Sequence, residues 1–350
     1  MSGWKLAGWI GAAGAAAVAA GAAVVWKITV KSQTPMRRPM IGLPPEPYEA
    51  VSFPSGGATL KGWFVPPKTG SASGEGARHP LMIVVHGWGS NKSRVLRYTD
   101  RLYNEGYALL LFDARSHGDS DEHPTPTGLT FRDDVLAAIA YARSREDVDP
   151  ERIGLLGHSM GGYGSLLALG KQAPVQAVVT DSMPVQLDTV VRAELKRRRM
   201  PAFPLSSVIP RVVYLRSGIT RRNLHELDVV AAVRSSRTPV LLVHSTGDMF
   251  IPSSELDYLV AGAERPGLAH LFVSSEGHSS SETDSRFWEQ VLPFLRQHVL
   301  KQQVPAGEGR PAYLSAQRRG PASAPPQTAP AAETAADVPV PAPLIPGESG

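Results

Sequence analysis

The sequence contains no cysteine among its 350 residues. A chain without cysteine forms no disulfide bond, no thiolate metal site and no cysteine nucleophile. The absence leaves the compartment open, because a reducing and an oxidising environment would suit such a chain equally well.

Charge is modest both in amount and in balance. Charged residues make up 19% of the chain, aromatic residues make up 7%, and the formal net charge is +4. Nucleic-acid binding usually needs clustered Lys and Arg interleaved with aromatic side chains, so we expect no nucleic-acid partner. The sequence shows no metal-ligand cluster and no nucleotide-binding fingerprint, so we expect neither a metal nor a cofactor. Hydrophobic residues, at 42%, suffice for a sizeable core.

The first segment has no charged residue between positions 6 and 26 and consists mainly of Ala, Gly and Val. Such a run would cross a hydrocarbon core of roughly 30 Å as a helix. Trp4 and Trp9 lie near one end and Trp26 lies at the other, where interfacial indole rings are usually found. We therefore predict a single-pass membrane anchor over residues 1–31.

Two other interpretations of this segment stay open. Small residues at positions 19–23 could form the cleavage site of a signal peptide, and the run could instead be a buried helix of a soluble fold. For an anchor, the basic residues on its two sides indicate the orientation. Lys27, Lys31, Arg37 and Arg38 follow the run, whereas Lys5 and the terminal amine precede it. By this small difference, the positive-inside rule favours a cytoplasmic location for the rest of the chain.

Proline marks both flanks of the central region. Residues 32–47 are proline-rich and are predicted to form an extended linker. Residues 301–350 contain ten prolines with many Ala, Ser and Thr. Such a segment buries too little apolar surface to offset its conformational entropy. We predict a disordered tail there, and a proline motif that binds a partner protein is the alternative.

Residues 48–300 alternate short apolar runs with helix-like stretches. The segment 48–65 alternates around Gly56-Gly57 and is predicted to be an antiparallel hairpin at a sheet edge. Buried strands are predicted at residues 81–85, 108–112, 153–156, 177–180, 240–244 and 270–273. Helix-like stretches include residues 131–145 and 161–170. This alternation predicts an α/β fold with a mostly parallel sheet covered by helices on both faces.

One serine stands in a pentapeptide of the form Gly-x-Ser-x-Gly, at residues 157–161. It follows the predicted strand 153–156 and precedes a predicted helix, which is the placement of a nucleophile elbow. The sharp turn needs small neighbours, and Gly157, Gly161 and Gly162 meet that need. Ser159 is therefore the predicted nucleophile, and a glycine-rich turn with an incidental serine is the alternative.

A serine hydroxyl needs a base that a carboxylate orients. In this arrangement the acid and then the histidine follow the serine along the chain. Asp248 comes just after the predicted strand 240–244, where catalytic groups collect in open α/β sheets. His278 comes just after the predicted strand 270–273. We predict that His278 is the general base and that Asp248 orients it, although each alone would also fit a turn or a loop.

Acyl chemistry also needs at least two backbone N–H donors for the oxyanion. One is expected from Met160, the residue after the nucleophile. The other is expected from Trp88, in the segment His86-Gly87-Trp88-Gly89 that follows the predicted strand 81–85. His86 is expected to order that loop by hydrogen bonding rather than to act as a base.

These segments resemble the α/β-hydrolase superfamily over residues 48–300. The likeness rests on His-Gly-Trp-Gly, Gly-His-Ser-Met-Gly-Gly, Gly-Asp-x-x-Ile-Pro, Gly-His-Ser and the loop at residues 112–120. The sequence looks most similar to bacterial esterase, serine-aminopeptidase-like and monoglyceride-lipase-like groups. The resemblance implies structural roles for Asp113, Arg115 and Ser120. Ser116 departs from the pattern, because relatives often have glycine there.

The resemblance further implies a cap over the site at residues 184–238. This segment is basic, with eleven Arg and Lys residues against four Asp and Glu. A solvated helix face would account for the excess. The sharper hypothesis is that residues 196–199 dock on anionic lipid headgroups beside the anchor.

Together these features predict a membrane-tethered serine hydrolase that cleaves carboxylic esters through an acyl-enzyme on Ser159. The expected partners are a small-molecule ester or acyl substrate and, through the first helix, a membrane. An aminopeptidase or amidase is the first alternative, because esters and amides share this machinery. A non-catalytic scaffold with a proline-rich tail is the second. The sequence leaves the acyl chain length and the oligomeric state open.

Overall fold

The apolar runs of the sequence form an eight-stranded sheet in the computed structural model, which describes residues 3–68 and 77–302. The strands are, in chain order, β1 Glu49–Ser55, β2 Ala58–Val65, β3 His79–Val85, β4 Ala108–Phe112, β5 Val148–His158, β6 Ala177–Asp181, β7 Val240–Gly247 and β8 Leu268–Glu276. The tail predicted at 301–350 lies outside the described residues from position 303 onward.

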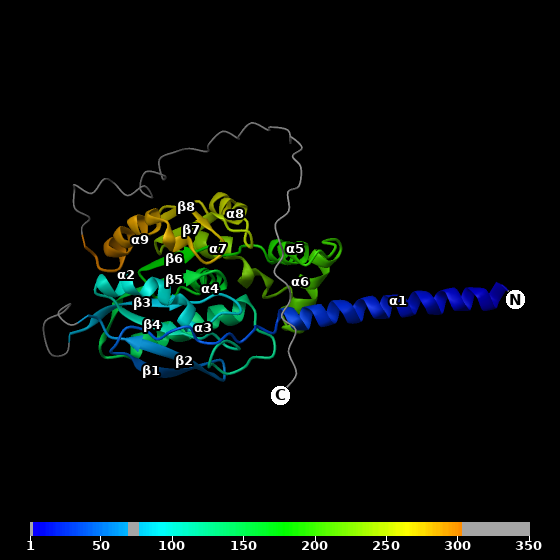
Figure 1. Ribbon diagram of the computed structural model, residues 1–350, viewed down its shortest axis with the longest axis horizontal. Helices are drawn as coiled ribbons and strands as arrows, with labels where there is room; N and C mark the ends of the chain where they lie inside the picture. The colour runs from blue at the N-terminus through cyan, green and yellow to red at the C-terminus, as the bar shows by residue number, and fades with distance from the viewer. Residues whose placement is uncertain (1–2, 69–76, 303–350) are drawn as a thin grey trace, which may run out of the picture. The chain divides into compact units, whose positions relative to one another are not determined.

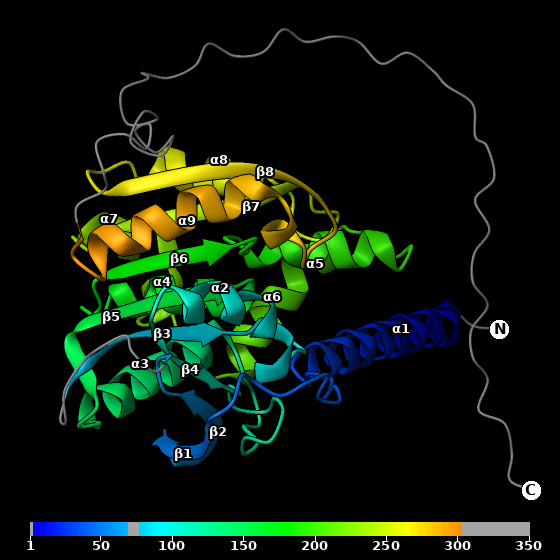
Figure 2. The ribbon, with the colours of Figure 1, turned by 60° about the vertical axis from the view of Figure 1, so that its left-hand side comes forward.

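The strand order in space is β1-β2-β4-β3-β5-β6-β7-β8, as Figure 2 shows. β2 pairs antiparallel with β1 and β4, and the remaining neighbours pair parallel. The hairpin between β1 and β2 turns at Gly56 and Gly57, whose φ angles of 54° and 82° are readily adopted by glycine. The predicted α/β fold, with a mostly parallel sheet and an edge hairpin, is confirmed.

Helices cover both faces of the sheet (Figure 1). The helices and 3-10 turns are, in chain order, α1 Gly3–Ser32, η1 Lys92–Tyr98, α2 Thr99–Asn104, α3 Gly128–Ser144, α4 Met160–Leu169, α5 Leu187–Arg197, α6 Leu205–Arg216, η2 Leu224–Leu227, α7 Val229–Ser235, α8 Ser254–Gly262, η3 Ser281–Thr283 and α9 Ser285–His298. One apolar layer joins the sheet to α3, α4, α7 and α8, and the other joins it to η1, α2 and α9.

Successive strand residues point into opposite layers. In β3, Ile83 belongs to the first layer and Val84 to the second, and both are fully buried. Leu155 and Leu156 of β5 divide in the same way. Burial on both faces explains why these strands are continuous apolar runs rather than alternating ones.

The connection from β6 to β7 contains α5 and α6, which we call the cap helices. Their packing forms a third apolar cluster around the buried residues Leu195, Ile209 and Val213. Val25 and Ile28 of α1 pack against this cluster. The C-terminal part of α1 therefore contacts the cap helices through apolar side chains.

The segment predicted as an extended linker has no helix or strand over residues 35–48. It nevertheless lies against the rest of the chain. The guanidinium of Arg37 donates to the carbonyl oxygens of Gly118 and Ser120, and the Asn91 amide donates to the carbonyl oxygen of Arg38 at 2.8 Å. These contacts hold the segment beside the carboxyl ends of the strands.

Candidate functional site

Three side chains from three separate strand ends meet at one edge of the sheet. Ser159 directly follows β5, Asp248 directly follows β7, and His278 lies two residues after β8. The three strands are parallel neighbours or near neighbours, so their carboxyl ends lie at the same edge. Residues separated by as many as 119 positions are thereby brought into hydrogen-bonding distance.

The backbone at Ser159 is held in a turn that few residues adopt. Its φ of 52° and ψ of −122° lie in a sparsely populated region, at a cost on the order of 1–3 kcal/mol. The Ser159 N–H donates to the Asp181 carbonyl at 2.8 Å. A Cβ at Gly157 would lie 2.6 Å from the Gly161 carbonyl, and a Cβ at Gly161 would lie 2.4 Å from the Val85 oxygen. Glycine is therefore required at both positions for this close approach.

The hydroxyl, the imidazole and the carboxylate form a continuous hydrogen-bonded row. His278 Nδ1 donates to Asp248 Oδ2 at 2.6 Å, which leaves Nε2 free to accept from the Ser159 hydroxyl at 2.9 Å. Asp248 Oδ1 accepts from the N–H groups of Phe250 and Ile251 at 2.8 and 2.9 Å. The structure thus brings together all three residues predicted to form the site.

The environment of Asp248 keeps its carboxylate ionised. Burial by itself raises the pKa of this carboxyl, but the hydrogen bond and charge of His278 outweigh it, and the two backbone N–H donors add to the effect. The net result is a pKa below the usual value for aspartate. An ionised acceptor at this place fixes the tautomer of His278 with its proton on Nδ1.

The loop after β3 lies directly beside the serine. A Cβ at Gly87 would lie 3.0 Å from the Ser159 Cβ, which is closer than an ordinary van der Waals contact, so a side chain there would press on the serine. Trp88 and Met160, the two predicted oxyanion donors, line the same cavity as Ser159. Their roles as N–H donors stay predictions, because an oxyanion forms only during reaction.

His86 orders this loop, as expected from the sequence. Its Nδ1 donates to the Gly87 carbonyl at 2.7 Å, and its Nε2 accepts from the Ala114 N–H at 3.0 Å. Burial lowers the pKa of His86 to about 4, so the ring is neutral at pH 7. A neutral ring can make both bonds at once, which ties the β3 loop to the loop after β4.

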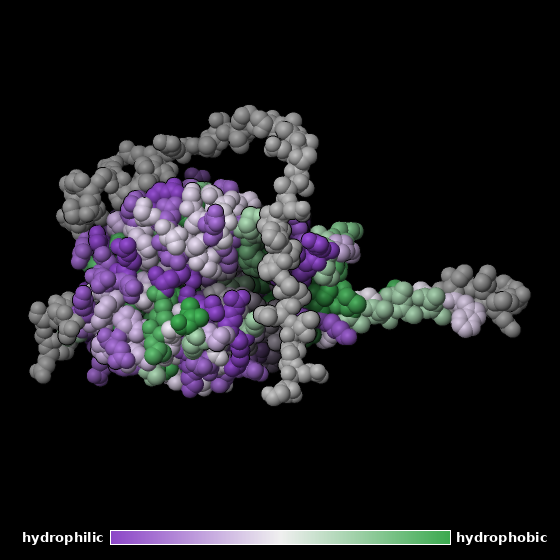
Figure 3. Space-filling model, viewed as in Figure 1, coloured by the Kyte–Doolittle hydropathy of each residue, from purple (hydrophilic) through white to green (hydrophobic). Residues whose placement is uncertain are grey.

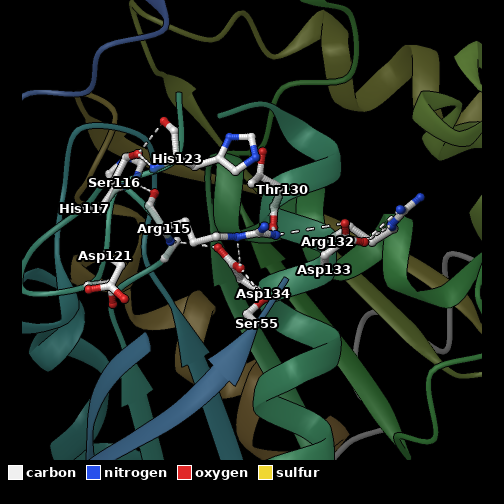
Figure 4. Close-up of polar contacts among 12 residues, drawn as sticks. Ser55, Arg115, Ser116, His117, Asp121, His123, Thr130, Arg132, Asp133 and Asp134 are labelled. Carbon is white, nitrogen blue, oxygen red and sulfur yellow. Dashed lines mark hydrogen bonds and ion pairs between the residues drawn. The ribbon is translucent and has the colours of Figure 1, made fainter. Parts of the chain in front are cut away.

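A network of ion pairs and hydrogen bonds holds the loop after β4. Asp113 accepts from the Lys92 ammonium at 2.6 Å, and the Ser120 hydroxyl donates to the Asp113 carbonyl oxygen. Arg115 binds Asp134 of α3 through its Nε at 2.6 Å and its backbone N–H at 2.8 Å (Figure 4). These contacts support the structural roles that the resemblance implies for Asp113, Arg115 and Ser120.

The hydrogen bonds of Ser116 account for a serine at a position where relatives often have glycine. Its φ of 67° lies in the left-handed region that glycine would enter without strain. The Ser116 hydroxyl, however, accepts from the His123 N–H at 2.8 Å and donates to the His123 carbonyl at 3.0 Å (Figure 4). These two bonds offset the strain and close the loop, which a glycine could not do.

The sequence analysis did not identify Asp181, a buried carboxylate beside His158. Asp181, at the end of β6, accepts from the Tyr98 hydroxyl at 2.5 Å and lies 3.6 Å from His158 Nδ1. Burial by itself raises the pKa of Asp181, but His158 and Arg97 outweigh it and hold the pKa well below its usual range. The available signal was an acidic residue at the carboxyl end of a predicted strand.

His158 links this buried group to the site. Burial, together with the charge of Arg97, lowers its pKa to about 4. Its ring centroid lies 4.8 Å from that of His278, and its Nε2 is 3.2 Å from the Ser279 hydroxyl. The neutral His158 therefore packs against His278 and positions the loop that carries it.

Above the serine lies a cavity of about 1360 Å³. Side chains from the cap helices, the end of α1 and the loops around Ser159 line this cavity.

Glu194 pairs with Arg197 and Arg198, so part of the positive charge of the cap is compensated by a neighbouring carboxylate. Within residues 3–68 and 77–302, no group of three His, Cys, Asp or Glu residues is arranged to hold a metal ion.

Comparisons with known proteins agree with this geometry. The family model of the alpha/beta hydrolase fold matches residues 80–207. YfhR, an uncharacterised protein of Salmonella typhimurium, is 30% identical over 249 residues, which cover 68% of this chain and 76% of the relative. An esterase from Pyrococcus furiosus has a TM-score of 0.59 at 20% identity, covering 76% of this chain and 97% of the esterase.

A second structural neighbour is a peptidase rather than an esterase. An acylaminoacyl peptidase from Pyrococcus horikoshii has a TM-score of 0.57 at 19% identity, covering 74% of this chain and 42% of the peptidase. At such identities the structural likeness shows a common fold and leaves the substrate undetermined.

Proposed function

The chain belongs to the α/β-hydrolase superfamily, and from this membership and the geometry at Ser159 we propose a serine hydrolase that cleaves carboxylic esters. One observation carries the proposal. His278 Nε2 lies 2.9 Å from the Ser159 hydroxyl while its Nδ1 donates to Asp248 at 2.6 Å. A nucleophile, a base and an orienting acid in this order can form an acyl-enzyme.

In the first half of the reaction, His278 removes the proton of Ser159 as the oxygen attacks the ester carbonyl. The negative charge that develops on the carbonyl oxygen is stabilised by the backbone N–H groups of Met160 and Trp88. The protonated imidazole is stabilised by the Asp248 carboxylate. As the carbon–oxygen bond of the ester breaks, His278 returns its proton to the leaving alcohol, and the acyl group stays on Ser159.

In the second half, His278 removes a proton from water, and the resulting hydroxide attacks the acyl carbonyl. The same two N–H groups stabilise the second oxyanion. Collapse breaks the bond to Ser159, whose oxygen takes the proton back from His278. The products are a carboxylic acid and the regenerated enzyme.

A membrane anchor over residues 1–31 completes the proposal. The segment Ala12–Ser32 of α1 is long and apolar enough to cross a membrane, with a mean hydropathy of 1.6, and its apolar stretch is almost entirely unburied. The side chains of Trp9 and Trp26 are exposed. The two tryptophans bracket the uncharged stretch at residues 10–25 of α1, and indole rings usually lie at the interfaces of a bilayer.

The test uses the full chain in detergent, with a fluorophosphonate probe and p-nitrophenyl butyrate. Ser159→Ala should abolish labelling and lower hydrolysis at least about a thousandfold, because the nucleophile is lost. Ser254→Ala, at an exposed serine on α8, should leave both unchanged. Labelling that survives in Ser159→Ala, or an unlabelled wild-type chain, would contradict the proposal. Faster turnover of a peptide anilide than of the ester would favour the amidase alternative.

A further inference from the structure

The cavity above Ser159 is not closed by the hydrolase fold alone. Ser159 and His278 line it together with Ile28 and Lys31, which belong to the last turns of α1. Val191 of α5 and Val213 of α6 line it as well. One cavity therefore joins the reacting serine to the helix that is the candidate membrane span.

The last turn of α1 and the residue that follows it are fixed to the cap helices by specific contacts. Thr29 and Gln33 are buried, with 0% and 4% exposure. The Gln33 amide donates to the Ser217 hydroxyl at 2.8 Å and accepts from the Arg216 guanidinium at 2.9 Å. Ile28 packs on the apolar cluster of the cap helices. The wall that α1 contributes is thus a packed part of the cavity.

The surface around this junction suits hydrocarbon. Figure 3 shows strongly hydrophobic side chains where α1 meets the cap helices, continuous with the apolar surface along α1. Phe203, between the cap helices, is 83% exposed, and Leu215 at the end of α6 is 77% exposed. Large exposed apolar residues beside a candidate membrane span mark a surface that contacts lipid.

The size and lining of the cavity favour a long apolar ligand. Its volume of about 1360 Å³ exceeds the roughly 300–1,000 Å³ of typical small-molecule sites. The side chains that α1, α5 and α6 contribute include Ile28, Leu187, Val190, Val191, Ile209 and Val213. A short acyl group would leave most of this apolar lining uncovered.

From these observations we infer that the substrate is a long-chain acyl ester resident in the bilayer. Its acyl chain leaves the membrane along α1 and lies between α1 and the cap helices, with the carbonyl at Ser159. The anchor helix is therefore a specificity element as well as a tether. This inference rests on the proposed ester hydrolysis and names the substrate class of that same site.

The experiment reconstitutes the full chain in phosphatidylcholine vesicles and measures kcat/KM for p-nitrophenyl palmitate and p-nitrophenyl butyrate. The wild-type chain should prefer the palmitoyl ester. Ile28→Trp narrows the cavity at α1 and should lower the palmitoyl-to-butyryl ratio at least about tenfold. Ala23→Trp is the matched control, since Ala23 is exposed on a different face of α1 from Ile28 and does not line the cavity. Its ratio should equal that of the wild type.

A second variant keeps the inference falsifiable if Ile28→Trp fails to fold. Val191→Trp narrows the same cavity from α5 and should lower the ratio in the same direction. Fluorophosphonate labelling of Ser159 reports a folded site in each variant. A wild type without preference for the palmitoyl ester, or folded cavity variants with an unchanged ratio, would overturn the inference while leaving ester hydrolysis intact. Failure of the wild type to hydrolyse either ester would instead refute the proposed function.

Discussion

Three histidines near the site, His86, His117 and His158, are buried in their neutral form. Burial lowers their pKa values to about 4, 3 and 4 respectively. In the unfolded chain a histidine titrates near its ordinary pKa of about 6.5. Below that pH the unfolded state therefore binds more protons than the folded state. The stability that the neutral rings allow is complete above about pH 6.5 and is lost as the pH falls towards 4.

We expect the thermal midpoint of the full chain in detergent to be flat above pH 6.5 and to fall between pH 6.5 and 4. His117→Gln removes one of the three groups and should make this fall shallower, because one fewer proton is taken up on unfolding. Thermal melts across this pH range measure the slope. Asn104→Gln, at an exposed residue that does not titrate, should keep the wild-type slope. An equal slope in His117→Gln would show that His117 does not contribute.

At the scale of elements, α8 supports the start of the cap. The buried carboxylate of Glu255 accepts from the backbone N–H groups of Val185 and Gln186, both at 2.7 Å. These residues connect β6 to α5. Glu255 therefore fixes the point at which the chain leaves the sheet to form the cap helices.

Glu255→Ala should lower the free energy of unfolding by about 2–4 kcal/mol, because two N–H groups lose a charged acceptor. Glu255→Gln keeps one acceptor oxygen and should cost less. Urea denaturation of the full chain in detergent measures both. Glu264→Ala, at an exposed position just after α8, should change stability by less than about 0.5 kcal/mol. A Glu255→Ala chain as stable as the wild type would contradict this role.

At the scale of the whole molecule, α1 combines an apolar, exposed stretch with a packed end. Its apolar stretch suits a bilayer, whereas its last turns pack on the cap helices. A cleaved signal peptide would remove the residues before about position 24 and leave the packed turns in place. The two interpretations therefore predict different masses and different membrane attachment.

The full chain produced in a bacterial host should remain in the membrane pellet after alkaline carbonate extraction. Its intact mass should include residues 1–26, because an anchor is retained. Mass spectrometry of the extracted protein checks this. A soluble chain that begins after residue 23 would instead support a signal peptide. Replacing Ala16 and Ala20 with Lys should move the intact chain to the soluble fraction, because charge within a span opposes insertion.

The local sequence pattern was sufficient to predict the strands and the turn at Ser159. Each apolar run from 81–85 to 270–273 lies inside an observed strand, because burial on both faces imposes a continuous apolar sequence. α8 and α9 are absent from the sequence-based expectations. α9 carries a helical signal in its sequence, because Phe287, Val291 and Phe294 recur at helical spacing and are buried on one face. α8 is only nine residues long and has a weaker pattern.

The sequence by itself determined the α/β architecture, the tight turn at Ser159 and the chain order of Ser159, Asp248 and His278, because these depend on local spacing. Tertiary structure decided which distant groups meet. The bond from Gln33 to Ser217 spans 184 positions, and the bond from Tyr98 to Asp181 spans 83. No local pattern encodes such pairs, since each depends on how whole elements pack. For this reason only the fold shows that the first helix forms a wall of the cavity above the serine.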